Sequence, residues 1–103
     1  MNWVRDLSLP KPNLWQETRL DLTIRGDSKI YLAKVGRSNS ETVKVGDWVT
    51  WFPYIDFEDI CLGNVSEEEA KKKAIATHMK RLREIIEDKQ LMLSSIEGLV
   101  RRG

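Results

Sequence analysis

Hydrophobic and polar residues alternate along the first half of the chain. Every second residue of the segment 20–24 is apolar, and polar residues stand between them. A period of two is typical of a half-buried strand, so we expect a strand over residues 15–25. The triplet Gly26-Asp27-Ser28 is a turn signal, and a second alternating run over residues 29–35 completes a predicted hairpin.

Further strands are expected before residue 65. Residues 47–54 form a third, with Trp48 and Trp51 on opposite faces, and residues 59–62 form a short fourth. Residues 1–13 contain Pro10 and Pro12, which neither a helix interior nor a central strand accepts, so we expect an irregular arm there. These patterns predict an antiparallel sheet of three or four strands over residues 14–64.

The pattern then changes to that of a helix. Ser66 and Glu69 have the spacing of a capping box, and neither Gly nor Pro interrupts residues 67–97. Apolar residues recur at steps of three and four from Ile75 to Val100, which is the spacing of one helix face. We therefore expect a long helix over residues 66–100. The fold prediction is α+β, in a single domain spanning residues 1–103, with the helix packed on one face of the sheet.

The length of this helix raises a question about its far end. A helix of this size measures about 45 Å, whereas a strand of six to eight residues spans only about 20–27 Å. The sheet therefore covers only part of the apolar face, and the uncovered part comprises Leu93, Ile96, Leu99 and Val100. Either the helix breaks near Asp88–Gln90 and folds back, or this face pairs with a second copy or with another protein. Lys89 at one seam position is typical of a short coiled-coil dimer.

Composition narrows the class of protein. The chain has 103 residues, of which 41% are hydrophobic and 32% charged, and its net charge is +1. Such a chain forms a globular domain without a global field that attracts nucleic acid or a membrane. No apolar run approaches the roughly 18 residues of a membrane span. The lone Cys61 and the absence of a signal peptide predict a cytoplasmic protein.

The sequence offers little catalytic chemistry. Its single histidine, His78, falls in the middle of the expected helix, and no partner stands at a spacing that would activate it. Cys61 lies in an apolar strand, where a buried and inert thiol is the usual case. Neither a metal-ligand spacing nor a glycine-rich phosphate loop is recognisable. We expect a protein that is not an enzyme and binds no cofactor or metal.

Two blocks of opposite charge follow each other. Every charged residue between positions 56 and 69 is acidic, and every charged residue between 71 and 83 is basic. The acidic loop offers a surface to a basic partner site, through Asp56, Glu58 and Asp59. The basic block offers an alternative surface for nucleic-acid phosphates, through Lys71, Lys72, Lys73, Lys80, Arg81 and Arg83. A solvated helix face is the simpler explanation of the basic block, because the preceding glutamates repel phosphate.

The aromatic residues leave two interpretations open. A single helix covers only one face of the sheet, so Trp48 and Trp51 cannot both lie beneath it. Either all of these rings belong to a core on both faces, or at least one is an exposed anchor for a protein partner. The candidate anchors are Trp48, Trp51 and Tyr54.

One stretch resembles a known family. Residues 47–56, with Phe52-Pro53 at the end of a strand, followed by Gly63 and Ser66-Glu67-Glu68-Glu69-Ala70, resemble HicB-type antitoxin domains over about residues 47–90. Small phage and prophage accessory proteins have a similar layout. The resemblance implies a phage or mobile-element accessory protein that binds and inhibits a host protein, such as a defence or nucleic-acid-processing enzyme. The alternatives are a nucleic-acid-binding module and an antitoxin-like dimer.

Overall fold

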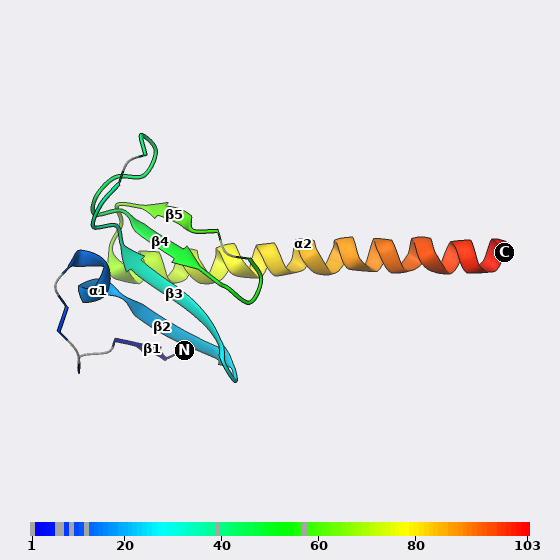
Figure 1. The fold of residues 1–103 in the computed structure, drawn as a ribbon, viewed down its shortest axis with the longest axis horizontal. Coiled ribbons are helices and arrows are strands. Elements are labelled where there is room, and N and C mark those ends of the chain that lie inside the picture. Colours follow the sequence, from blue (N-terminus) through cyan, green and yellow to red (C-terminus); the bar gives the residue numbers. More distant parts are fainter. Residues whose placement is uncertain (1, 6–7, 9, 12, 39, 57) are drawn as a thin grey trace.

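An antiparallel sheet packs against one long C-terminal helix (Figure 1). The structure is a computed structural model that describes every residue except 1, 6, 7, 9, 12, 39 and 57. Five strands lie in the order β1-β2-β3-β4-β5, so each pairs with its neighbour in the sequence. The predicted α+β class is confirmed. In chain order the elements are β1 (Trp3–Val4), α1 (Leu14–Thr18), β2 (Leu20–Arg25), β3 (Ser28–Lys34), β4 (Trp48–Trp51), β5 (Ile60–Gly63) and α2 (Glu67–Arg102).

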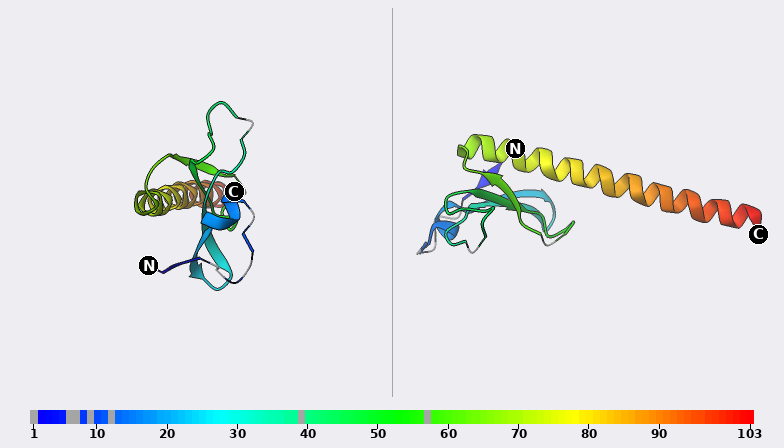
Figure 2. Two further views of the ribbon diagram at one scale, coloured as in Figure 1. Left: turned by 90° about the vertical axis from the view of Figure 1, so that its left-hand side faces the viewer. Right: turned by 90° about the horizontal axis from the view of Figure 1, so that it is seen from above.

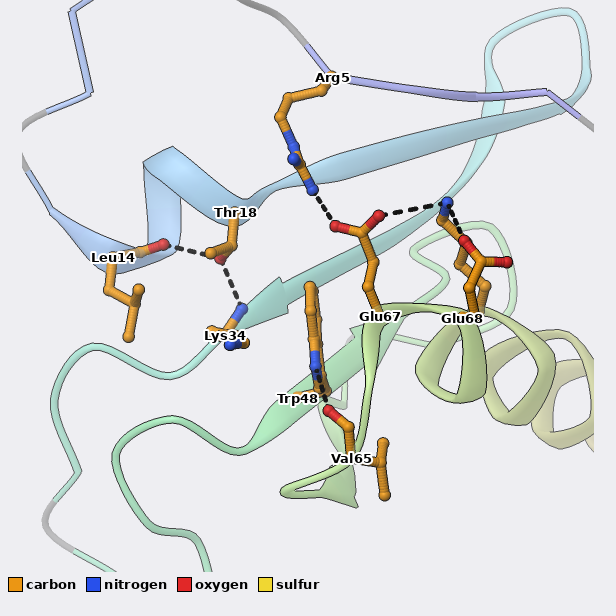
Figure 3. Close-up of polar contacts among 9 residues, drawn as sticks. Arg5, Leu14, Thr18, Lys34, Trp48, Val65, Glu67 and Glu68 are labelled. Carbon is orange, nitrogen blue, oxygen red and sulfur yellow. Dashed lines mark hydrogen bonds and ion pairs between the residues drawn. The ribbon is translucent and has the colours of Figure 1, made fainter.

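The sheet has five strands, so the prediction of three or four is wrong by at least one. The additional strand is β1, in the segment where we expected an irregular arm, and its Trp3 is the register partner of Leu22. Arg5, just after β1, forms an ion pair with Glu67 at the start of α2 (Figure 3). A strand of two residues is too short to show periodicity, so contacts made elsewhere in the fold decide its place.

The segment predicted to begin the first strand forms a short helix instead. Asn13 caps α1, since its side chain accepts a hydrogen bond from the backbone N–H of Gln16. At the other end, the Thr18 hydroxyl donates to the carbonyl of Leu14 at 2.7 Å and accepts from the N–H of Lys34 at 2.8 Å (Figure 3). These local bonds end the helix beside β3, so the alternating strand begins only at Leu20.

The main core lies between the sheet and the first turns of α2. Leu20, Leu32, Trp48 and Leu62 are buried against Ala70 and Ala74, both of which have no exposed surface. Two small alanines let the helix approach the sheet closely, and the Trp48 indole N–H donates to the carbonyl of Val65 at 2.9 Å (Figure 3). The predicted alternation along β4 is confirmed, because Trp48 and Thr50 face α2 whereas Val49 and Trp51 face away.

The long helix α2 is continuous over 36 residues and does not break near Asp88–Gln90. The predicted cap is confirmed, since the Ser66 hydroxyl accepts from the N–H of Glu69 at 3.2 Å. At 1.5 Å per residue the helix measures about 54 Å. It therefore extends far beyond the sheet and gives the molecule an extent of 61 Å in its longest direction (Figure 2).

Candidate interaction surfaces

The distal part of α2 carries a row of apolar side chains that the protein itself leaves uncovered. We call this row the distal stripe, and its exposed fractions rise from 38% at Leu82 to 74% at Val100. Ile96 and Met92 stand about five full turns after His78 and Ala74, so the stripe continues the face that packs on the sheet. The distal stripe consists of Leu82, Ile86, Leu93, Ile96 and Val100, flanked by Ile85, Met92 and Leu99.

An apolar hollow lies where the stripe meets the sheet. It encloses about 140 Å³ between the end of the β2–β3 hairpin and α2, and Ile24, Met79 and Leu82 contribute to its wall. Ile24 is 52% exposed and Met79 46% exposed. We call it the junction hollow. The junction hollow and the distal stripe share Leu82, so the two form one continuous apolar surface.

The opposite face of the sheet holds an aromatic stack. The Trp51 ring lies between those of Trp15 and Tyr31, at centroid distances of 4.7 and 5.0 Å, and the Arg19 guanidinium covers Tyr31 at 4.9 Å. Each ring face of Trp51 therefore has an internal neighbour, and the stack holds α1 on the sheet. Trp51 is half-buried in this role.

The other two candidate anchors differ from each other. Trp48 is only 2% exposed, so the proposal that it is a surface anchor needs correction. Strand alternation could assign it to a face, but it could not tell which face the helix covers. Tyr54 is 77% exposed, follows β4 and stacks on Phe52 at 6.1 Å. It is the one predicted anchor whose side chain is mostly accessible.

The residues of the acidic loop face different surroundings. Asp56 forms an ion pair with Arg81 at 3.1 Å on the helix side of the sheet. Asp59 borders a hollow of about 540 Å³ on the opposite side, and burial raises the pKa of its carboxyl group. Glu58 is exposed to solvent. The structure therefore does not gather these carboxylates into one acidic surface.

The basic block is also divided. Lys71 lies 3.4 Å from Glu67 and 3.2 Å from Glu68, whereas Arg81 is paired with Asp56. Glu67 also contacts Arg5, and although burial raises its pKa, the hydrogen bonds and charges of Arg5 and Lys71 lower it overall. The remaining cations are exposed, make no ion pair with a described residue, and fall within about 100° of one another on the outer side of the helix; they are Lys72, Lys73, Lys80 and Arg83.

His78 serves the fold. It is 3% exposed, and its Nε2 lies 2.9 Å from the hydroxyl of Thr50. That hydroxyl donates its only hydrogen to the carbonyl of Tyr31, so His78 carries its proton on Nε2 and donates to Thr50. Burial lowers the pKa of the imidazole, and the charge of Asp56 opposes this shift in part. The ring therefore anchors α2 to the centre of the sheet.

Cys61 departs from its prediction. We expected a buried thiol, but the side chain is exposed on β5, where its Sγ lies 3.7 Å from a carboxylate oxygen of Asp47. Among the residues that the structure describes, no group of three or more His, Cys, Asp or Glu side chains could hold a metal ion. In that same described part of the chain, no helix has the length and apolar character needed to cross a membrane.

Comparison of the chain with protein-family models, with curated proteins and with solved structures finds no match. The resemblance to HicB-type antitoxins and phage accessory proteins thus stays a prediction. The surfaces themselves must support any functional argument, and the apolar surface along α2 is a feature that internal packing leaves uncovered.

Proposed function

We propose that the protein is a non-enzymatic binding protein and that its principal contact surface is the distal stripe. It acts as an accessory factor that docks a helix onto another protein chain and modulates that chain. The observation that carries this proposal is a straight helix on which the exposed apolar residues, except Leu91, continue the side that is buried at its start. Anchors at steps of three and four are the pattern with which amphipathic helices bind partner grooves and partner helices.

Free energy favours a covered stripe. Single exposed apolar residues are common on protein surfaces, but a contiguous apolar row marks an interaction site. Burial of apolar surface contributes about 25 cal/mol per Å², so residues such as Leu93 at 56% and Ile96 at 58% exposure have much left to bury. An isolated helical segment is only marginally stable in water, so a partner also stabilises the helix that it binds.

The predicted role in a phage or mobile element, with inhibition of a host enzyme in the cytoplasm, depends on the resemblance alone. It is compatible with a docking helix and adds a partner identity that the surfaces do not specify. Tyr54 and the exposed carboxylate of Glu58 offer further contacts to such a partner.

Site-specific photo-crosslinking tests the proposed function. Leu93 and Leu91 are both exposed leucines of α2, at 56% and 69%, but only Leu93 belongs to the distal stripe. A photoreactive amino acid at position 93, in cells that produce the protein naturally, should give a protein adduct. The same residue at position 91 is the matched control and should give little. Equal yields at the two positions, or no adduct at 93, would contradict the proposal.

Nucleic-acid binding is the second candidate. It is supported by the exposed cations on the outer side of α2, namely Lys72, Lys73, Lys80 and Arg83. If they contact phosphates, affinity for duplex DNA or RNA should fall steeply with salt, and each charge removed should reduce that salt dependence by about one unit of slope. Affinity that does not respond to salt would eliminate this candidate.

A further inference from the structure

We propose that the distal stripe is covered by a second copy of this chain, whose α2 runs antiparallel to the first. This inference rests on the proposed function and names the occupant of the same surface. Three features of the chain lead to it: the breadth of the stripe, the side of α2 on which the sheet packs, and the charges that border the stripe.

The stripe has the repeat of a two-helix coiled coil. The d positions of the heptad repeat hold Leu82, Lys89 and Ile96, and every a position holds an apolar residue. The g positions are apolar as well. Side chains at a are Met79, Ile86, Leu93 and Val100, and those at g after His78 are Ile85, Met92 and Leu99.

This breadth favours an antiparallel pair. In a parallel pair each g residue faces an e residue of the other helix, so Met92 would lie against the charged Glu97 of the second copy. In an antiparallel pair g faces g, and the apolar flanks of the two helices cover each other. The e residues then face each other on the opposite flank, where Arg83, Gln90 and Glu97 are polar.

The position of the sheet leads to the same orientation. The sheet packs on the side of α2 that holds Ala70 and Ala74, and helix geometry continues this side into the distal stripe. The right-hand view of Figure 2 shows the sheet lying along one side of the first part of α2. Two helices in contact are 8–10 Å apart, and a packed sheet occupies about 10 Å. A parallel pair of straight helices would therefore force both sheets into the space between them. An antiparallel pair places each sheet beyond Val100 of the other copy.

Contact with the sheet also fixes the register. Ile75 is already packed against the sheet residues Leu22, Ile30 and Phe52, so the second helix cannot reach it. The longest overlap that remains begins at Leu82, opposite Val100 of the second copy. In the same register Ile86 lies opposite Ile96, Lys89 opposite Leu93, and Met92 beside its own symmetry mate.

Charge complementarity supports this register. It places Arg83 of each copy beside Glu97 of the other, on the e flank, so the dimer gains two symmetric ion pairs. A shift by one heptad toward the sheet would leave Arg83 beside Gln90. The two charges are 14 positions apart in one straight helix, about 21 Å, so they cannot contact each other within a single chain.

The junction hollow receives the end of the overlap. Leu99 and Val100 of the second copy arrive beside Leu82 and Met79, which form part of the hollow's wall. Ile24, on the adjoining hairpin, then loses its exposure to solvent. The proposed dimer thus covers the distal stripe and the junction hollow together.

A charge exchange measured by sedimentation equilibrium tests the inference. The intact chain should form a dimer in reversible equilibrium. Arg83→Glu alone, or Glu97→Arg alone, replaces both ion pairs by like-charge contacts and should weaken the dimer about five- to tenfold. Arg83→Glu combined with Glu97→Arg should restore the affinity of the unaltered chain to within about twofold. Glu87→Arg makes the same charge change on the outer side of α2 and should have little effect.

Two results would overturn the inference. One is a chain that stays monomeric at its highest soluble concentration. The other is a dimer whose single variants weaken it while the double variant does not recover, because the antiparallel register is then wrong. A monomer that still gives a foreign adduct from position 93 would remove this inference and leave the proposed function intact. A monomer without any adduct at 93 would remove both. Circular dichroism of each variant checks that α2 is retained.

Discussion

The two halves of α2 share one sequence pattern and differ in what covers them. Up to His78, the inner face is buried by the sheet, with Ala70 and Ala74 fully enclosed. From Met79 onward, in a segment that the structure describes completely, no residue is buried. The apolar period continues from Ile75 to Val100 through both halves, with Lys89 as its one polar position. The comparison teaches that a helix pattern predicts an amphipathic face, whereas the length of the neighbouring sheet decides how much of that face the chain can cover itself.

The first half of α2 and the turn that follows it are also fixed by polar contacts, which the helix beyond Arg81 lacks. His78 donates to Thr50 inside the core, and Glu67 joins the helix start to Arg5 of the N-terminal segment. The last of these inward polar contacts is the ion pair of Arg81 with Asp56. Beyond Arg81 the helix has only its own backbone hydrogen bonds and its side-chain neighbours, which stabilise an isolated helix only weakly.

The largest expected difference between a covered and an uncovered region comes from truncating one leucine in each. Leu32 has no exposed surface, so Leu32→Ala should lower the free energy of unfolding by about 2–5 kcal/mol. Leu93→Ala, in the distal stripe, should change the stability of the monomer by less than about 0.5 kcal/mol. Urea denaturation in dilute solution measures both. A loss at Leu93 as large as that at Leu32 would mean that the distal half packs against the sheet.

A smaller effect is expected at the start of α2. Ser66→Ala removes the hydroxyl that accepts from the N–H of Glu69 and should cost about 1 kcal/mol of stability. Ser94→Ala removes a serine from the distal half, where alanine has the higher helix propensity, so it should have no cost. Thermal unfolding followed by circular dichroism compares the two variants. Equal destabilisation by both would show that the cap contributes nothing specific.

The pH dependence of stability tests the buried histidine. Because burial lowers the pKa of His78 below its ordinary value of 6.5, the unfolded chain binds a proton more readily than the folded one. The stability contributed by the neutral ring is therefore complete above about pH 6.5 and is lost as the pH falls from 6.5 toward the folded pKa. Denaturation at a series of pH values should show this decline.

His78→Gln provides the control for that experiment. Glutamine keeps an N–H donor for Thr50 but does not titrate, so the variant should lose this part of the pH dependence. A decline below pH 6.5 that is the same in both proteins would assign the effect to groups other than His78.

The sequence predicted those elements whose signals are local. The capping box at Ser66, the long helix that follows it and the alternation along β4 depend on residues close together in the chain, and the structure agrees with them. Whether the helix breaks near Asp88–Gln90 was left open by the sequence, and the structure shows that it does not. The short elements α1 and β1 were not predicted, because segments of five and two residues show too little periodicity. The fate of each tryptophan depended on which face of the sheet α2 covers, and this is decided by the whole fold. Thus Trp48 became core and Trp51 part of a stack.

For the candidate sites too, features with a local sequence signal were predicted and features that depend on the whole fold were not. The distal stripe could be predicted because the apolar face of the helix is longer than the sheet that could cover it. The pairing of Asp56 with Arg81 joins a loop to a helix 25 positions later, and no spacing rule predicts it. It divides both charge blocks that looked uniform in the sequence. The junction hollow likewise combines Ile24 with Leu82, which only the folded chain brings together.

Amide hydrogen exchange along α2, measured at a low and a high protein concentration, tests the central claim most directly. At low concentration the amides of the first half should be strongly protected, whereas those after Leu82 should exchange rapidly, because no residue of that segment is buried. At high concentration the exchange of residues 83–100 should slow while the first half stays unchanged. Distal amides that are equally protected at both concentrations would contradict the account, since the second half would then be stable without a partner.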